Sequence, residues 1–278
     1  MKVFACLGML IMSITSSLLA QNEFSSGGNQ YARFAEQVNY GNSEWVVLYQ
    51  HVALDPILNK EERYTNVLLS NNHTALYEDY GKYQIDSATA LMNRNKITER
   101  EAMRLYSTYR RSSSSYLLKN KERKLQTYCD RIFIDRYFYE EPIPTWQWQQ
   151  SEDTTTICGY LCRKAECSFR GRDWVVWYAE DISLSDGPWK LGGLPGMILS
   201  AESKDGEHKF TATRVEQRST RIVHDHFKHA FKTKRERFNK ELKSYRTETS
   251  RYIQSNNELQ MEALPLNKRM FYCPLEKE

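Results

Sequence analysis

The histidines near residue 225 have the side-chain type and the spacing of metal ligands. His224, His226 and His229 fall within six residues, and on a helix His226 and His229 would share one face. Imidazole nitrogens placed in this way could bind a transition metal. Lys228 and Lys232 lie among and beside these histidines, however, and would repel a cation. The sequence therefore favours a role for these histidines as residues on the polar face of a basic helix, and it predicts no cofactor. A metal site formed by the three histidines is the alternative.

Cysteines offer a second kind of chemistry. Five of them follow residue 20, at Cys129, Cys158, Cys162, Cys167 and Cys273, and an odd number leaves at least one thiol unpaired or intermolecular. Cys158 and Cys162 on one strand would lie about 13 Å apart, which is too far for a disulfide. Cys129 could pair with Cys273, but the sequence leaves the pairing open. Cys162 could also act as a nucleophile with a distant histidine, although a core or disulfide role is favoured.

Other patterns typical of catalysis are missing from the sequence. It contains no Gly-x-Ser-x-Gly elbow, no His-Glu-x-x-His pair and no phosphate-binding loop. Glu180, Asp181 and Asp186 could form paired carboxylates, but they are more typical of turns and solvated loops. The sequence therefore predicts no catalytic residue.

Residues 187–198 (GPWKLGGLPGMI) combine four glycines and two prolines with bulky apolar side chains. Turn residues usually lie in solvent, whereas Leu, Trp, Met and Ile favour burial. Leu194 to Met197 is predicted to be a type II turn, in which Pro195 fixes φ and Gly196 supplies a positive φ. We interpret the run as a rigid apolar corner whose shape depends on Gly187, Pro188, Gly193, Pro195 and Gly196.

Aromatic side chains gather around this corner. They could form a wall for an apolar or peptide ligand, although packing in the core of a hairpin is favoured. The candidate ligand-binding residues are Trp174, Trp177, Trp189, Leu194, Pro195 and Met197.

The corner also carries a family resemblance. Residues 193–198 (GLPGMI) resemble the six-residue signature of the GLPGLI family, with Met197 in place of leucine. Residues 159–165 (GYLCRKA), residues 169–172 (FRGR) and Trp177-Tyr178 resemble motifs that precede that signature in the family. The resemblance covers roughly residues 146–201. It implies a secreted or envelope protein of the Bacteroidetes for which no activity is established.

The first twenty residues are typical of a secretory signal peptide. Lys2 precedes an apolar stretch at residues 3–19, and Ala20 offers a cleavage point before Gln21. No later segment is long and apolar enough to span a bilayer. We expect an exported protein of the periplasm or cell envelope, or a secreted one, with no transmembrane segment in the mature chain.

The remaining chain predicts an α+β protein that is mainly β. Alternating segments at 154–169, 172–180, 197–202 and 209–215 indicate antiparallel hairpins in a curved sheet, open or partly closed into a barrel. We expect a β domain over residues 21–215 with a helical insert near 80–110. Apolar residues at three- and four-residue spacing predict an amphipathic helical segment packed on the sheet over residues 216–262, followed by a tail at 263–278.

Charge is concentrated near the C-terminus. The net charge is +4, and residues 216–260 hold eleven Lys and Arg against six Asp and Glu. An exported protein rarely meets nucleic acid, so a solvated face or an envelope partner is expected instead. The predicted function is a non-enzymatic envelope protein that binds a peptide, lipid-like or protein partner. The alternatives are a hydrolase with an unidentified site, or a metal-handling protein that uses residues 224–229.

Overall fold

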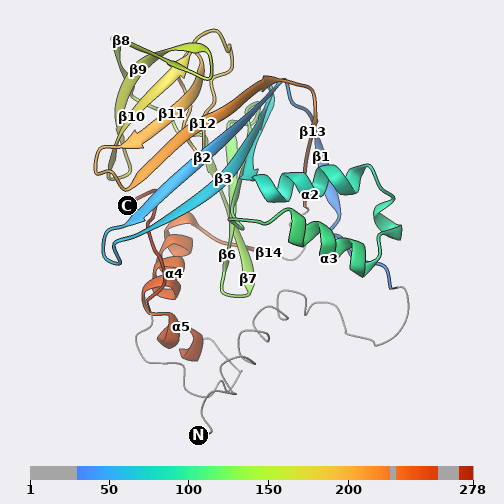
Figure 1. Cartoon of the computed structure of the whole chain (residues 1–278). Helices are drawn as coiled ribbons and strands as arrows, with labels where there is room; N and C mark the ends of the chain where they lie inside the picture. Colours follow the sequence, from blue (N-terminus) through green and yellow to red (C-terminus); the bar gives the residue numbers. More distant parts are fainter. Residues whose placement is uncertain (1–29, 226–229, 256–268, 278) are drawn as a thin grey trace, which may run out of the picture.

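A long curved sheet dominates the computed structural model, which describes residues 30–225, 230–255 and 269–277. Within these ranges, twelve strands pair in one sheet, antiparallel throughout except where β14 runs parallel to β7. In spatial order they are β14 (Ala230–Lys232), β7 (Asp135–Pro142), β6 (Leu125–Ile132), β5 (Tyr116–Asn120), β4 (Thr74–Asp79), β3 (Lys60–Ser70), β2 (Trp45–Asp55), β12 (His208–Gln217), β11 (Met197–Ser203), β10 (Arg172–Ala179), β9 (Tyr160–Phe169) and β8 (Gln149–Ile157). The sheet bends strongly without closing (Figure 1). The predicted fold class, mainly β with a curved antiparallel sheet, is confirmed.

Both faces of the central strands are covered. Along β2, Val47 and Tyr49 join one apolar cluster, whereas Val46 and Leu48 belong to another on the opposite face. The first cluster includes the 187–198 corner, and the second lies against the helical insert. Figure 1 shows α2 and α3 on one side of the sheet and α4 on the other.

The predicted helical insert is present as α2 (Tyr80–Ala90), the 3₁₀ turn η1 (Arg94–Lys96) and α3 (Glu99–Thr108). Each helix begins at a side chain that satisfies free backbone N–H groups. Asp79 accepts a hydrogen bond from the Lys82 N–H, and Thr98 forms a capping box with Glu101. The break between the two α-helices falls at residues 91–98.

The C-terminal helix begins later than its periodicity predicts. Residues up to Gln217 belong to β12, and β13 (Arg221–Asp225) pairs with β1 (Gln37–Asn42) in a separate two-stranded sheet. In the described residues after Asp225, the helices are α4 (Arg235–Thr247) and α5 (Thr249–Ser255). The branched residues Ile222 and Val223 suit a strand once β1 supplies a partner, so the predicted helix was too long at its N-terminal end. The apolar face of α4 packs Phe238 against β6 and β7.

The predicted strand at 154–169 is two strands. β8 and β9 meet at Cys158 and Gly159, which have φ values of 50° and 85°. Positive φ at both positions is the mark of a two-residue type I′ hairpin turn, and cysteine, an unusual residue at the first position, hid the turn in the sequence. The next turn, at Arg170 and Gly171, has φ values of 44° and 75° and lies where the sequence predicts it.

The 187–198 corner is rigid for a different reason from the one predicted. Gly196 does not have the positive φ of a type II turn, which corrects that prediction, and Gly193 instead has a φ of 83°. A Cβ on Gly196 would lie 2.2 Å from the carbonyl oxygen of Ala179, so glycine is needed for close approach of two backbones.

Asp186 anchors this corner and is not the solvated loop charge that the sequence favours. It is 1% exposed and accepts a hydrogen bond from Ser70. It also pairs with Lys119 at 3.4 Å and Lys121 at 2.5 Å, and Lys119 donates to the Leu191 carbonyl. Strands β3 and β5 and their neighbouring turn therefore fix the corner from the other half of the sheet.

Residues 269–277, which we call the C-terminal segment, lie along the sheet. Asp55 accepts hydrogen bonds from the Arg269 side chain and the Tyr272 N–H, and Arg172 donates to the Pro274 carbonyl. Glu276 pairs with Lys190 at 2.5 Å and with Arg170 at 2.7 Å. Charged contacts thus hold the segment against distant strands.

Candidate functional site

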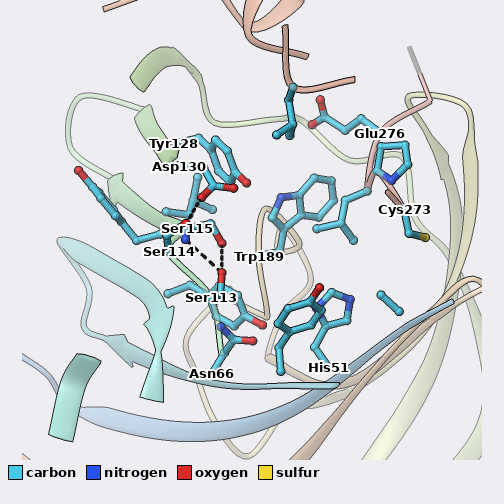
Figure 2. Close-up of a pocket in the computed structure, with 18 of the residues that line it drawn as sticks. His51, Asn66, Ser113, Ser114, Ser115, Tyr128, Asp130, Trp189, Cys273 and Glu276 are labelled. Atoms are coloured by element: carbon cyan, nitrogen blue, oxygen red, sulfur yellow. Dashed lines mark hydrogen bonds between the residues drawn. The ribbon is translucent and has the colours of Figure 1, made fainter. Parts of the chain in front are cut away.

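A pocket of about 550 Å³ lies where the sheet, α4, residues 111–115 and the C-terminal segment meet. The strands contribute side chains such as His51, Tyr64 and Tyr128, and α4 contributes Phe238. The volume falls in the range typical of small-ligand sites. Figure 2 shows that labelled residues from widely separated parts of the sequence face this one space. We take it as the candidate functional site.

Trp189 is the residue of the 187–198 corner that reaches this pocket. Its ring packs against Trp174 and Phe169, with centroids 6.2 Å and 6.4 Å apart. The backbone of Trp189 has a φ of 52°, which a bulky residue rarely adopts. Such a conformation persists only when the surroundings enforce it. The corner therefore holds an indole ring against the pocket in a fixed position (Figure 2).

The loop at residues 112–115 is positioned by a buried carboxylate. Asp79 accepts hydrogen bonds from the Ser112 N–H and hydroxyl, each at 2.7 Å, and from the Ser113 N–H at 2.9 Å. The Ser113 and Ser115 hydroxyls are hydrogen-bonded to each other at 2.8 Å (Figure 2). In the sequence, the two arginines that directly precede these serines are the signal that could have pointed to a site here.

Two carboxyl groups with different surroundings line the pocket. Asp130 accepts a 2.6 Å hydrogen bond from Ser114 and a 2.7 Å bond from its neighbour's backbone N–H. Burial raises the pKa of Asp130, and these bonds offset only part of the effect. Glu62 accepts from Tyr64 at 2.6 Å and pairs with Lys60 at 2.7 Å. Burial, the hydrogen bond to Glu62 and the negative charge of Asp130 raise the pKa of Tyr64. Both carboxyl groups therefore lie close enough to the Tyr64 hydroxyl to influence its ionisation.

A cysteine and two histidines make a chain at the pocket edge. Cys273 Sγ lies 3.2 Å from His208 Nε2, and His208 Nδ1 lies 3.1 Å from His51 Nε2. Burial raises the pKa of the Cys273 thiol to about 12, whereas burial and the charge of Arg172 lower the pKa of His208 to about 3. At neutral pH this is a neutral pair and not an activated thiolate.

The cysteines singled out in the sequence take other roles. Cys162 is fully buried, and burial raises its pKa to about 11, so the structure gives no support to a Cys162 nucleophile. All five cysteines after residue 20 are unpaired in the structure, including Cys129 and Cys273.

The predicted ligand-binding residues do not converge on the pocket. Trp174, Leu194 and Met197 lie in the core, Trp177 packs against it, and Pro195 is exposed. Trp189 alone of the six lines the pocket. A binding role for the other five stays a prediction. Sequence reasoning missed the remaining wall because its residues come from strands and loops far apart in the chain.

The histidine cluster is described only in part. His224 is buried, its ring centroid lies 3.5 Å from that of Tyr116 at a tilt of 36°, and its Nε2 atom lies 3.7 Å from Glu78 Oε2. His226 and His229 lie outside the described residues. Within the residues that are described, no group of three or more His, Cys, Asp or Glu side chains is arranged to hold a metal ion.

A scan of protein families matches residues 138–246 to a family described as "N-glycanase peptide, N-terminal domain". Two crystal structures of PNGF-II, in space groups C2 and P21, resemble this chain at 15% identity and a TM-score of 0.48. Each comparison covers 74% of this chain and 34% of the other, so the chain spans about a third of the length of those proteins.

A more distant likeness, to a putative outer membrane lipoprotein-sorting protein domain from Vibrio parahaemolyticus, has 7% identity and a TM-score of 0.21. It covers 74% of this chain and 91% of that domain. A search of curated protein sequences found no match.

The family match corrects the resemblance drawn from the 187–198 corner. The matching family is that of the N-glycanase N-terminal domain and not GLPGLI. The assignment to the GLPGLI family was therefore wrong.

The same match overturns the main functional prediction. A non-enzymatic envelope protein was expected, but the similarity is to a domain of a hydrolytic enzyme family and favours the alternative, a hydrolase-related protein. In the part of the chain that the structure describes, no helix is long and apolar enough to cross a membrane.

Proposed function

We propose that this protein is a hydrolase, related to N-glycanases, that binds an N-glycosylated peptide in the pocket on the sheet. The observation that carries the proposal is the pair of carboxyl groups, Asp130 and Glu62, in one pocket with unlike surroundings. Two titratable groups whose environments differ can divide the roles of acid and base. The similarity to the N-glycanase domain supports this choice of substrate.

The pocket walls suit a sugar bound to a peptide. Tyr64, Tyr128 and Trp189 offer flat apolar faces, whereas Asn66 and the Ser113 hydroxyl offer hydrogen bonds. Apolar walls with a few polar groups are typical of sites that orient a ligand.

The carboxyl groups can serve hydrolysis of the bond between glycan and asparagine. Glu62, which is held in place by contacts with Lys60 and Tyr64, takes a proton from water as the water oxygen bonds to the amide carbon. The carbon–nitrogen bond breaks, and Asp130 gives its proton to the departing nitrogen. Burial raises the pKa of Asp130, which suits it to hold that proton.

The test is release of glycan from an N-glycopeptide, followed by mass spectrometry. Asp130→Asn should reduce the rate by about 100-fold or more, as loss of a general acid does, with little change in binding. Asp135→Asn on the exposed turn of the same hairpin is the matched control and should keep the full rate. Binding without release by the wild-type protein would refute hydrolysis, and absence of binding would refute the whole proposal.

Export belongs to the same proposal. We propose that the first twenty residues are removed during secretion, which would bring the protein to glycoproteins outside the cytoplasm. Sequencing the N-terminus of secreted protein tests this, because a mature chain should begin at Gln21. A retained Met1 would contradict it.

A further inference from the structure

One end of the pocket carries more positive charge than its neighbours neutralise. Arg111, Arg131 and Arg246 all line it, and they come from three separate elements. Arg111 lies just before the serine loop, Arg131 is near the end of β6, and Arg246 is in the last turn of α4. Arg131 and Arg246 are half-buried, so their guanidinium groups are not simply solvated surface charges.

The carboxyl groups that line the pocket form their ion pairs and hydrogen bonds with residues other than these three arginines. Glu276 pairs with Lys190, Arg170 and Arg235, and Glu62 pairs with Lys60. The Asp130 carboxyl accepts from the Ser114 hydroxyl and the backbone N–H that follows it. Among the described residues, no carboxylate oxygen lies within ion-pair distance of the three guanidinium groups, although the Asp130 carboxyl is close enough to interact electrostatically with all three.

Arg131 shows that the guanidinium groups at this end of the pocket lack some of their hydrogen-bond partners. Its Nε atom is buried and has no hydrogen-bond partner among the described residues. Burial and the charges of Arg136 and Arg111 lower the pKa of Arg131. Arg136 has its own partner in Asp225, at 3.8 Å, whereas within the described ranges the Arg111 side chain donates only to the Ser113 carbonyl. A buried donor without a partner is costly, and an anion in the pocket would supply one.

We propose that Arg111, Arg131 and Arg246 bind an anionic sugar of the substrate glycan through its carboxylate or sulfate group. Arginine is the side chain best suited to planar, two-pronged recognition of such oxyanions. The Ser113 and Ser115 hydroxyls stand beside this end and can bind sugar hydroxyl groups. The identity of the carrier as a glycan rests on the proposed function, whereas anion binding by the arginines does not.

The experiment measures calorimetric binding of three probes to the full chain: an N-glycopeptide with carboxylated sugars, the same glycopeptide with a neutral glycan, and inorganic sulfate. We expect the acidic glycopeptide to bind about 10-fold or more tightly than the neutral one, because hydrogen bonds to charged groups are the stronger kind. Raising the salt concentration should reduce this difference.

Variants then locate the site. Arg131→Gln should remove most of the preference for the acidic glycopeptide and leave the affinity for the neutral one unchanged. Arg246→Gln should do the same from another element, so a folding defect in one variant leaves the test intact. Arg104→Gln on the exposed side of α3 makes the same change in net charge and should have no effect.

The outcomes separate the two proposals. Equal binding of the acidic and neutral glycopeptides would overturn the anion site and leave the proposed function standing. Sulfate binding that is lost in Arg131→Gln, without binding of either glycopeptide, would support the anion site and refute the proposed function. Equal binding of a glycan-free acidic peptide would overturn the glycan as carrier of the anion.

Discussion

Replacing Gly196 with alanine tests the claim that close backbone approach shapes the 187–198 corner. A Cβ at this position would lie 2.2 Å from the Ala179 carbonyl oxygen, 2.6 Å from its carbon and 2.9 Å from the Glu180 Cα. Real Cβ atoms essentially never approach other atoms closer than 3.0 Å. The corner and the end of β10 would therefore have to move apart.

The size of the effect follows from the kind of atom that is contacted. Ala179 ends β10, is itself buried and pairs with Met197, so its carbonyl cannot turn aside as a flexible side chain would. Overpacking a close-packed core costs typically about 1–3 kcal/mol, and we expect about 3 kcal/mol here. In a protein of this size, that loss lowers Tm by roughly 6–12 °C.

The assay is urea unfolding followed by tryptophan fluorescence, with Gly206→Ala as the control. Gly206 has a φ of 74°, but no atom would lie within 4 Å of its Cβ. Alanine there bears only the cost of a left-handed backbone, about 1–2 kcal/mol. A loss for Gly196→Ala no larger than that for Gly206→Ala would refute the close-approach explanation.

Two further predictions concern buried charge. Burial raises the pKa of Glu78 to about 8 and lowers that of His224 to about 3. The contribution of protonated Glu78 to the free energy of unfolding has its full value below pH 4.5, the pKa of Glu78 in the unfolded chain, and it is lost as the pH rises to about 8. The His224 contribution is constant above pH 6.5. Between pH 6.5 and 8 the wild-type unfolding free energy should therefore fall by about 1–2 kcal/mol, and Glu78→Gln should abolish this slope; an unchanged slope would contradict the assignment. Arg172→Met, which removes a fully buried guanidinium from its ion pairs with Asp205 and Glu207, should cost about 3–5 kcal/mol in urea unfolding and speed proteolysis of the C-terminal segment. Lys277→Met removes a 41%-exposed partner of the same carboxylates and should cost less than about 1 kcal/mol; equal losses would show that burial of Arg172 is not decisive.

Local patterns in the sequence identify most strands and the helical insert. The hairpin turn at Arg170 and Gly171 and the two helices between residues 80 and 108 follow from alternation, turn residues and caps that act over a few positions. The same patterns fail where a distant partner decides the structure. Ile222 and Val223 form a strand because β1 lies beside them, and nothing near residue 222 specifies that neighbour.

The candidate site could not be predicted from the sequence, because it too depends on residues that are far apart in the chain. Asp130 and Arg131 lie on β6, but Glu62, Arg111 and Arg246 come from β3, a loop and α4, far apart in the sequence. Each one alone is typical of an ordinary surface charge. Their shared surroundings arise only when the sheet curves and α4 and the C-terminal segment cover it.

By itself, the sequence determined the mainly β fold class, the helical insert and a rigid apolar corner at residues 187–198, because these depend on short-range backbone preferences and on the period of apolar residues. Tertiary structure decided which charges are buried, as at Asp186 between Lys119 and Lys121, and which side chains face one pocket. Those outcomes depend on contacts between residues far apart in the chain, and local sequence carries little information about such pairing.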